Sequence, residues 1–216
     1  MPSSIKIPTY KFEELSDRAK ESARQWYRET ALDYEWYDST FENFGRICDI
    51  LGVRLKTRAV RLYGGGTRED PRIFFSGFSY QGDGACFEAN YAYAAGAHRE
   101  IRAYAPCDTE LHRIADSLRD VERRNFYQLR ADVTHRGRYY HEYSMEIRVD
   151  RNDDRHDVAE PDEEAVIEAM RELARWLYRA LDREYDYLTS DEAVDEAIIV
   201  NGYSFSEVGG RTIRLR

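Results

Sequence analysis

The chain has 216 residues and a formal net charge of −9, and hydrophobic residues make up 42% of it. This composition predicts a globular protein with a buried core and excludes wholesale disorder. It also argues against direct nucleic-acid binding, because phosphate recognition needs a basic surface.

The first half of the chain shows helical periodicity followed by alternating, strand-like patterns. Ser16 is placed to cap the first helix, and Gly52 is placed to end the second as a C-cap. The glycine-rich segment 63–71 is typical of a loop. The elements predicted here are a strand at 4–12, helices at 17–31 and 33–52, and strands at 53–62, 72–80 and 85–94.

The second half alternates between helices and one hairpin. Gly137 supplies a turn, Pro161 stands where a long helix begins, and Ser190 is placed to cap the last helix. The elements predicted here are a helix at 107–126, strands at 129–137 and 139–150, and helices at 162–188 and 190–202. The residues expected in the core are Trp26, Phe41, Phe44, Leu173 and Leu177.

Hairpin-linked strands beside helices predict an α+β fold, with an antiparallel sheet of about five strands and helices packed on one face. No linker divides the chain, so we expect a single domain over residues 1–216. Within it, residues 1–106 carry fifteen basic and fifteen acidic residues, whereas residues 107–216 carry 17 and 26. The whole net charge therefore belongs to the helix-rich second half.

No cofactor or metal site is expected. Cys48, Cys86 and Cys107 contain no CxxC pair, which argues against a disulfide framework or a zinc knuckle. His135 and His141 fall on neighbouring strands of one hairpin, but two histidines without a third ligand make a weak metal site. No segment approaches the ~20 apolar residues of a membrane span, and the N-terminus lacks the apolar core of a signal peptide. We therefore expect a cytoplasmic protein.

The segment FFSGFSYQGDGACF (74–87) has three glycines among aromatic residues and allows three interpretations. The first is a tight hairpin whose turn centres on Gln81–Gly84, with a positive φ at Gly84. The second is a partner-binding loop that uses Tyr80, Gln81 and Asp83. The third is a catalytic centre with Cys86 as nucleophile and Asp83 as its orienting group, although a buried cysteine more often behaves as a small hydrophobe.

Acidic residues are densest at 150–168, a segment that contains nine acidic residues and two arginines. Clustered carboxylates imitate the charge of phosphates and speed the encounter with a basic surface. This pattern nominates Asp153, Asp154, Asp157 and Glu160 as partner-binding residues. The alternative is an ordinary solvated helix start, since acids near a helix N-terminus are stabilising.

Three stretches resemble a family of small proteins encoded by phages and prophages. They are YKFEELSDRAKESAR, DYEWYDSTFENFGRICDILGV and FFSGFSYQGDGACFEANY, all within the first 95 residues. The shared pattern is an aromatic-Ser-Gly-Phe, a Gln-Gly-Asp-Gly-Ala-Cys-Phe and an upstream ELS..AK..A helix. Members are loosely labelled antitoxin-like, and no catalytic residues are carried over from them.

The resemblance implies a phage product that acts inside a bacterial host. By analogy with phage proteins of this size and acidity, the expected function is non-enzymatic inhibition of a bacterial defence complex, as anti-CRISPR proteins do. The expected partner is a host protein or ribonucleoprotein complex with a basic surface. The alternatives are an antitoxin-like partner of one toxin and a small hydrolase that uses Cys86.

Overall fold

The structure is a computed structural model that describes residues 8–32, 35–152 and 158–212. Its fold is α+β with antiparallel sheets, as the sequence predicts. The chain divides into two compact units. Residues 39–182 form the central unit, and residues 1–38 together with 183–216 form the terminal unit.

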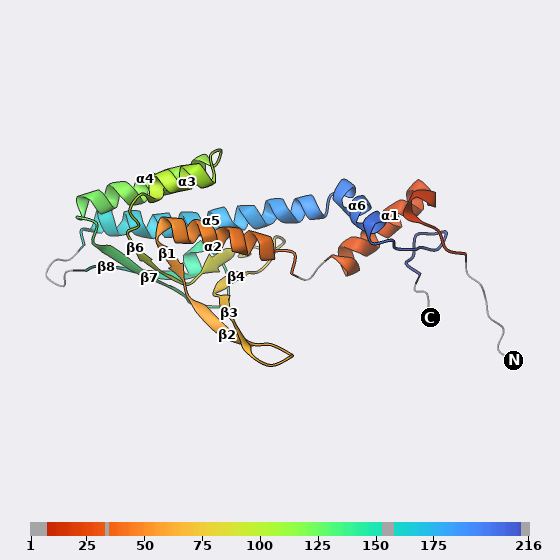
Figure 1. Cartoon of the computed structure of the whole chain (residues 1–216), viewed down its shortest axis with the longest axis horizontal. Helices are drawn as coiled ribbons and strands as arrows, with labels where there is room; N and C mark the ends of the chain where they lie inside the picture. The colour runs from red at the N-terminus through yellow and green to blue at the C-terminus, as the bar shows by residue number, and fades with distance from the viewer. Residues whose placement is uncertain (1–7, 33–34, 153–157, 213–216) are drawn as a thin grey trace. The chain divides into compact units, whose positions relative to one another are not determined.

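A four-stranded antiparallel sheet organises the central unit (Figure 1). Its order is β1 (Val53–Leu55), β6 (Ala89–Ala92), β7 (Leu129–His135) and β8 (Met145–Arg151). Side chains alternate between a buried and an exposed face. The buried positions include Val53, Tyr91, Ala131, Val133 and Val149, and the exposed ones include Arg54, Asn90, Arg130, Arg148 and Asp150. The sheet therefore has one core-facing side and one open, charged side.

Helices of the central unit cover the core-facing side of the sheet in Figure 1. They are α2 (Asp38–Leu51), α3 (Ala97–Tyr104), α4 (Thr109–Arg124) and, as far as residue 182, α5 (Glu160–Leu188). Phe44, Leu173 and Leu177 are fully buried there, which confirms their predicted place in the core. Phe41 is only half-buried. Sequence reasoning missed α3, because this short helix buries only Ile101.

Three extended segments, 53–61, 67–75 and 85–92, change pairing partners where they meet at one junction. The first runs from β1 into β2 (Thr57–Arg61), the second from β3 (Thr67–Pro71) into β4 (Ile73–Phe75), and the third from β5 (Ala85–Phe87) into β6. The Lys56 N–H donates to Glu88 O (2.8 Å), the Glu88 N–H to Arg72 O (2.9 Å), and the Arg72 N–H to Lys56 O (2.7 Å). These three hydrogen bonds form a closed ring with three sides. β1 pairs with β6 on one side, β2 with β3 on the second, and β4 with β5 on the third.

The junction splits the predicted strands at 53–62 and 85–94 into two strands each. The prediction of a loop over 63–71 is correct for residues 63–66 and wrong for residues 67–71, which form β3. Together β2 and β3 make a two-stranded arm that projects from the sheet in Figure 1. Almost every arm residue is exposed, so β3 lacks the hydrophobic alternation that marks a half-buried strand.

The terminal unit contains α1 (Asp17–Trp26), α6 (Asp191–Val200), a 3₁₀ turn at Phe12–Glu14 and a π-helical turn at Tyr27–Ala31. Ser16 and Ser190 cap α1 and α6, as predicted. The predicted strand at 4–12 was wrong where the structure describes it, because Tyr10 makes only an isolated bridge to Phe205. The small core consists of Phe12, Leu15, Ala19, Ala23, Val194, Ile198 and Phe205, with Trp26 partly buried against it.

Candidate partner-binding surface

The segment 74–87 folds as a short hairpin with a long loop. Ile73–Phe75 pairs with Ala85–Phe87, which confirms the antiparallel pairing, and residues 76–84 connect the two strands. The tight turn lies one residue earlier than predicted, since the Asp83 N–H donates to Tyr80 O (3.0 Å). Gly82 supplies the positive φ, at 99°, in the third position of this turn. Gly84 has no positive φ; it is required instead because a Cβ there would lie 2.6 Å from Tyr140 O.

Asp83 fixes the conformation of this loop. Its Oδ2 accepts hydrogen bonds from the backbone N–H groups of Ser79 (2.9 Å) and Tyr80 (2.8 Å). An aspartate that folds back onto preceding backbone groups stabilises a turn. The side chain of Tyr80 is left 81% exposed, and Gln81 is exposed beside it. Of the three predicted partner-binding residues in the loop, two are therefore presented to solvent and the third holds them in place.

Cys86 does not have the properties of a nucleophile. Its side chain is fully buried on β5. Burial raises the pKa of the Cys86 thiol to about 12, against a hydrogen bond from Ser144 that works to lower it. A reactive cysteine needs a lowered pKa and access to solvent. The environment of Cys86 is that of a core residue.

A second loop, residues 136–144 between β7 and β8, packs against the first. The ring of Tyr139 lies over Gly82, where an added Cβ would be 3.3 Å from Tyr139 Cδ1. Beneath the loops, the ring of Phe74 stacks on that of Tyr140 with centroids 5.4 Å apart. These contacts bring together two segments that are about sixty residues apart in the sequence.

The two loops present three exposed aromatic rings, which we call the tyrosine surface: Tyr80 (81% exposed), Tyr139 (51%) and Tyr143 (67%). Two arginines stack on these rings. The guanidinium of Arg138 lies 5.2 Å from the ring centroid of Tyr139, and that of Arg171 lies 5.2 Å from that of Tyr143. Tyrosine and arginine are the residue types enriched at the energetic centres of protein interfaces.

Sequence reasoning nominated Tyr80 but missed Tyr139 and Tyr143. The interleaved basic and aromatic residues of RGRYYHEYS (136–144) were the available signal. His135, just before this segment, and His141, within it, have separate backbone partners: His135 Nε2 contacts Tyr139 O (3.0 Å), and His141 Nδ1 accepts from the Tyr143 N–H (3.0 Å). Each therefore stabilises the second loop.

The acidic tract is partly neutralised inside the protein. Asp153, Asp154 and Asp157 lie outside the described residues, and Glu160 is exposed at the start of α5. Burial works to raise the pKa of Asp162, but hydrogen bonds from Arg124 and Asn125 outweigh it and lower the pKa.

Other acids of the second half are similarly paired. Glu172 pairs with Arg113 (2.6 Å), and Glu168 pairs with Arg175. In the terminal unit, both oxygens of Asp195 accept from Arg24, each at 2.7 Å. The exposed negative surface is therefore smaller than the composition suggests.

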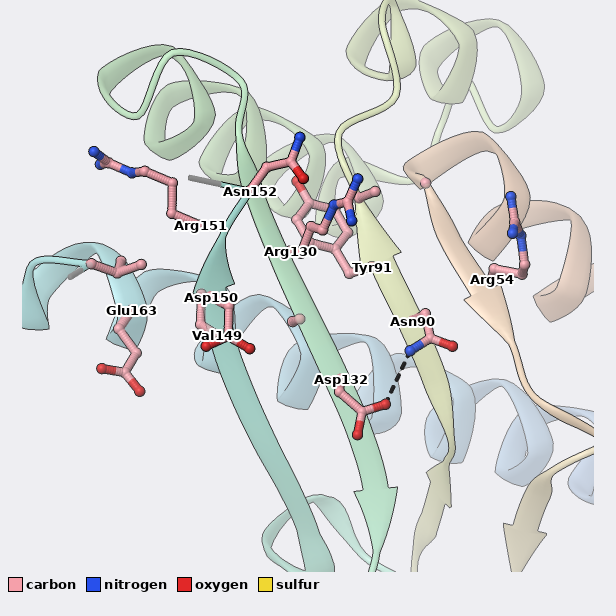
Figure 2. Close-up of a pocket in the computed structure, with 14 residues that line it drawn as sticks. Arg54, Asn90, Tyr91, Arg130, Asp132, Val149, Asp150, Arg151, Asn152 and Glu163 are labelled. Carbon is pink, nitrogen blue, oxygen red and sulfur yellow. Dashed lines mark hydrogen bonds between the residues drawn. The ribbon is translucent and has the colours of Figure 1, made fainter. Parts of the chain in front are cut away.

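A groove of about 1120 Å³ crosses the open face of the sheet (Figure 2). Its wall includes a row of cross-strand neighbours, Arg54, Asn90 and Asp132. The Asp132 carboxylate accepts from Asn90 Nδ2 (3.0 Å) and pairs with Lys56 Nζ (2.6 Å). The groove was not predicted, because its residues meet only through the strand register.

In the described part of the chain, no helix is both long enough and apolar enough to cross a membrane. No curated protein and no solved structure matches the chain. Residues 36–191, which include the whole central unit, match the family model described as Domain of unknown function (DUF8835). The chain belongs to this family.

Proposed function

We propose that the chain is a non-enzymatic binding protein that inhibits a bacterial defence complex, in the manner of anti-CRISPR proteins. The observation that supports a binding role is the tyrosine surface, where Tyr80 and Tyr143 are 81% and 67% exposed on loops held by internal hydrogen bonds. Rigid exposed rings bury a large area on binding at a small cost in side-chain entropy. The choice of a defence complex rests on the resemblance to phage-encoded proteins.

The exposed acids contribute the electrostatic part of the proposal. Glu160 and Glu164 are exposed on the first turns of α5 and have no ion pair with any described residue. Exposed carboxylates speed association with a basic surface and make it sensitive to salt. We assign the affinity mainly to the tyrosine surface, because many acids of the second half already have arginine partners within the protein.

The environment of Cys86 does not favour the hydrolase alternative. A thiol with a pKa of about 12 is almost entirely protonated at neutral pH, and its burial keeps a substrate carbonyl away. Asp83, the suggested orienting group, bonds backbone N–H groups of its own loop. Both residues have a structural role that accounts for their positions.

The experiment is affinity capture from a bacterial lysate with wild type and two matched double variants. Tyr80→Ala/Tyr143→Ala removes two rings of the tyrosine surface. Tyr63→Ala/Tyr187→Ala removes two comparably exposed tyrosines elsewhere.

A partner that binds wild type and the Tyr63/Tyr187 variant, but not the Tyr80/Tyr143 variant, supports the proposal. A defence complex identified by mass spectrometry supports inhibition, and a single toxin would support the antitoxin-like alternative. Equal capture by all three proteins would exclude the tyrosine surface.

A further inference from the structure

Part of the floor of the groove on the open face of the sheet consists of two small residues, Gly52 and Ala92. Gly52 lies opposite Ala92, whose N–H donates to Gly52 O (3.0 Å), and both residues line the groove. Gly52 has a φ of 78°, and a Cβ on it would clash with the Ala92 carbonyl oxygen. The backbone geometry itself therefore keeps this part of the floor open.

Two arginines stand on either side of this floor. Arg54 rises from β1, and Arg130 rises from β7 as the cross-strand neighbour of Ala92 (Figure 2). Within the part of the chain that the structure describes, neither guanidinium has a hydrogen bond or an ion pair. The nearest carboxylate in the row, Asp132, is already held by Lys56 and Asn90.

Two carboxylates occupy the opposite end of the groove. Asp150 is on β8 and Glu163 is on the first turns of α5, on the far side of Arg130 from Arg54 (Figure 2). Although Asp150 is the cross-strand neighbour of Arg130, the two form no ion pair, and neither carboxylate has a charged partner among the described residues. Arg151 also lines this end, but its guanidinium donates to Asn125 Oδ1. Among the described residues, the groove therefore has two arginines without a partner toward one end and two carboxylates without a charged partner toward the other.

We propose that this groove binds an extended segment of a partner protein that carries one acidic and one basic side chain. The acidic side chain would pair with Arg54 and Arg130, and the basic one with Asp150 and Glu163. Nucleic acid fits less well, because its continuous negative charge would meet the two carboxylates. A segment with both charges offers an oppositely charged partner to each of the four groove side chains, Arg54, Arg130, Asp150 and Glu163.

The strand register sets the spacing of the two charges. Arg54 and Asp150 stand on the first and fourth strands of the sheet, about 14 Å apart at ~4.8 Å per strand, and their cross-strand rows are two residues, about 7 Å, apart along the strands. Because the acidic side chain would lie between Arg54 and Arg130, the two charges are closer together than the roughly 16 Å that separates Arg54 from Asp150. An extended chain rises ~3.3 Å per residue, so the two charges should be about four residues apart. Side chains four positions apart in an extended segment point to the same face, so both can enter the groove.

This inference rests on the proposed binding function, but it is tested on the isolated full-length chain with synthetic peptides, without a cellular partner. The probe is a capped peptide of Gly and Ser with one Glu and one Arg four positions apart. The first control peptide has Glu and Arg adjacent, which places them on opposite faces. The second control probe is a single-stranded oligonucleotide of similar length. Binding is followed by amide chemical shifts, with Gly52 and Ala92 as reporters.

We expect the spaced peptide to shift these reporters and to bind at least about tenfold more tightly than the adjacent-charge peptide. The Arg54→Gln/Arg130→Gln variant should lose about tenfold or more in affinity. The matched variant Arg58→Gln/Arg61→Gln, which removes the same charge from exposed positions on β2, should bind like wild type.

No shift at about 2 mM peptide, or equal effects of the two variants, would overturn the proposal. Tighter binding of the oligonucleotide would show a polyanion site instead. None of these outcomes depends on the tyrosine surface, so failure here leaves the capture experiment decisive for the proposed function.

Discussion

The carboxylate of Asp83 accepts a hydrogen bond from the backbone N–H of Tyr80 (2.8 Å), and this bond holds the loop that presents the Tyr80 ring to solvent. The same oxygen accepts from the N–H of Ser79 (2.9 Å). Asp83, which the sequence predicts to contact a partner, therefore acts by positioning Tyr80, whose exposed ring can make such a contact.

Asp83→Ala should lower stability by roughly 1–2 kcal/mol, because two backbone donors lose a charged acceptor that water replaces only in part. For a protein of this size, the melting temperature should fall by about 2–8 °C. Asp83→Asn keeps an acceptor oxygen and should recover most of the loss. The two variants are compared by thermal unfolding; equal losses for Ala and Asn would contradict the hydrogen-bonding role.

Gly84→Ala tests the packing of the two loops. The new Cβ would lie 2.6 Å from Tyr140 O and 2.8 Å from His141 Cβ, so the second loop must move. We expect a loss of roughly 1–3 kcal/mol in denaturant unfolding. Gly45→Ala is the control: it lies within α2 with open space around it, and it should stabilise the protein by roughly 0.5–1 kcal/mol. A neutral Gly84→Ala would mean that the loops are not in contact.

Glu122 should make stability depend on pH. It is fully buried on α4, and burial raises its pKa against hydrogen bonds from Tyr91 and the Leu129 N–H. A carboxyl group with a higher pKa in the folded state takes up protons on folding. Its stabilising contribution is therefore complete below the unfolded pKa and is lost as pH rises through the folded pKa.

Glu122→Gln removes this titration. The melting temperature of the variant minus that of wild type should therefore increase as pH rises from about 4 to about 8. The exposed Glu164 provides the control, since Glu164→Gln makes the same substitution at a position that is not buried. A difference between Glu122→Gln and wild type that stays constant over this range would contradict the assignment.

The three cysteines should differ sharply in reactivity. Cys107 is exposed, whereas Cys48 and Cys86 are fully buried and their pKa values are raised by burial. At about pH 8, a thiol reagent should modify one cysteine rapidly in the native protein, and Cys107→Ser should abolish that phase. The measurement is the time course of labelling. Rapid labelling of Cys86 would revive the hydrolase alternative.

Regular helices were predicted from local signals that the fold retains. Ser16 and Ser190 cap α1 and α6, and Gly52 ends α2 with a φ of 78°. These features depend on residues a few positions apart, so the sequence pattern is sufficient. β3 was missed because the arm is exposed on both faces, and the hydrophobic alternation that would reveal a strand is absent.

The candidate sites depend more on distant residues. Tyr80 was found because its loop stands out locally, but Tyr139 and Tyr143 join it only through contacts such as that of Gly82 with the Tyr139 ring. In the same way, Arg54 and Arg130 share a groove because β1 and β7 both pair with β6. A change of pairing partners at the junction of Lys56, Arg72 and Glu88 is invisible in a strand pattern.

The most direct test of the central claim, that the protein inhibits by binding through the tyrosine surface, is a titration of the captured defence complex. Residual activity of the complex is measured against the molar ratio of added protein, at concentrations well above the dissociation constant. We expect a linear fall that ends near about one molecule per binding site, and for Tyr80→Ala/Tyr143→Ala a loss of affinity of roughly 30-fold or more. Complete inactivation at about one molecule per hundred complexes, or inhibition by the double variant equal to that by wild type, would contradict it.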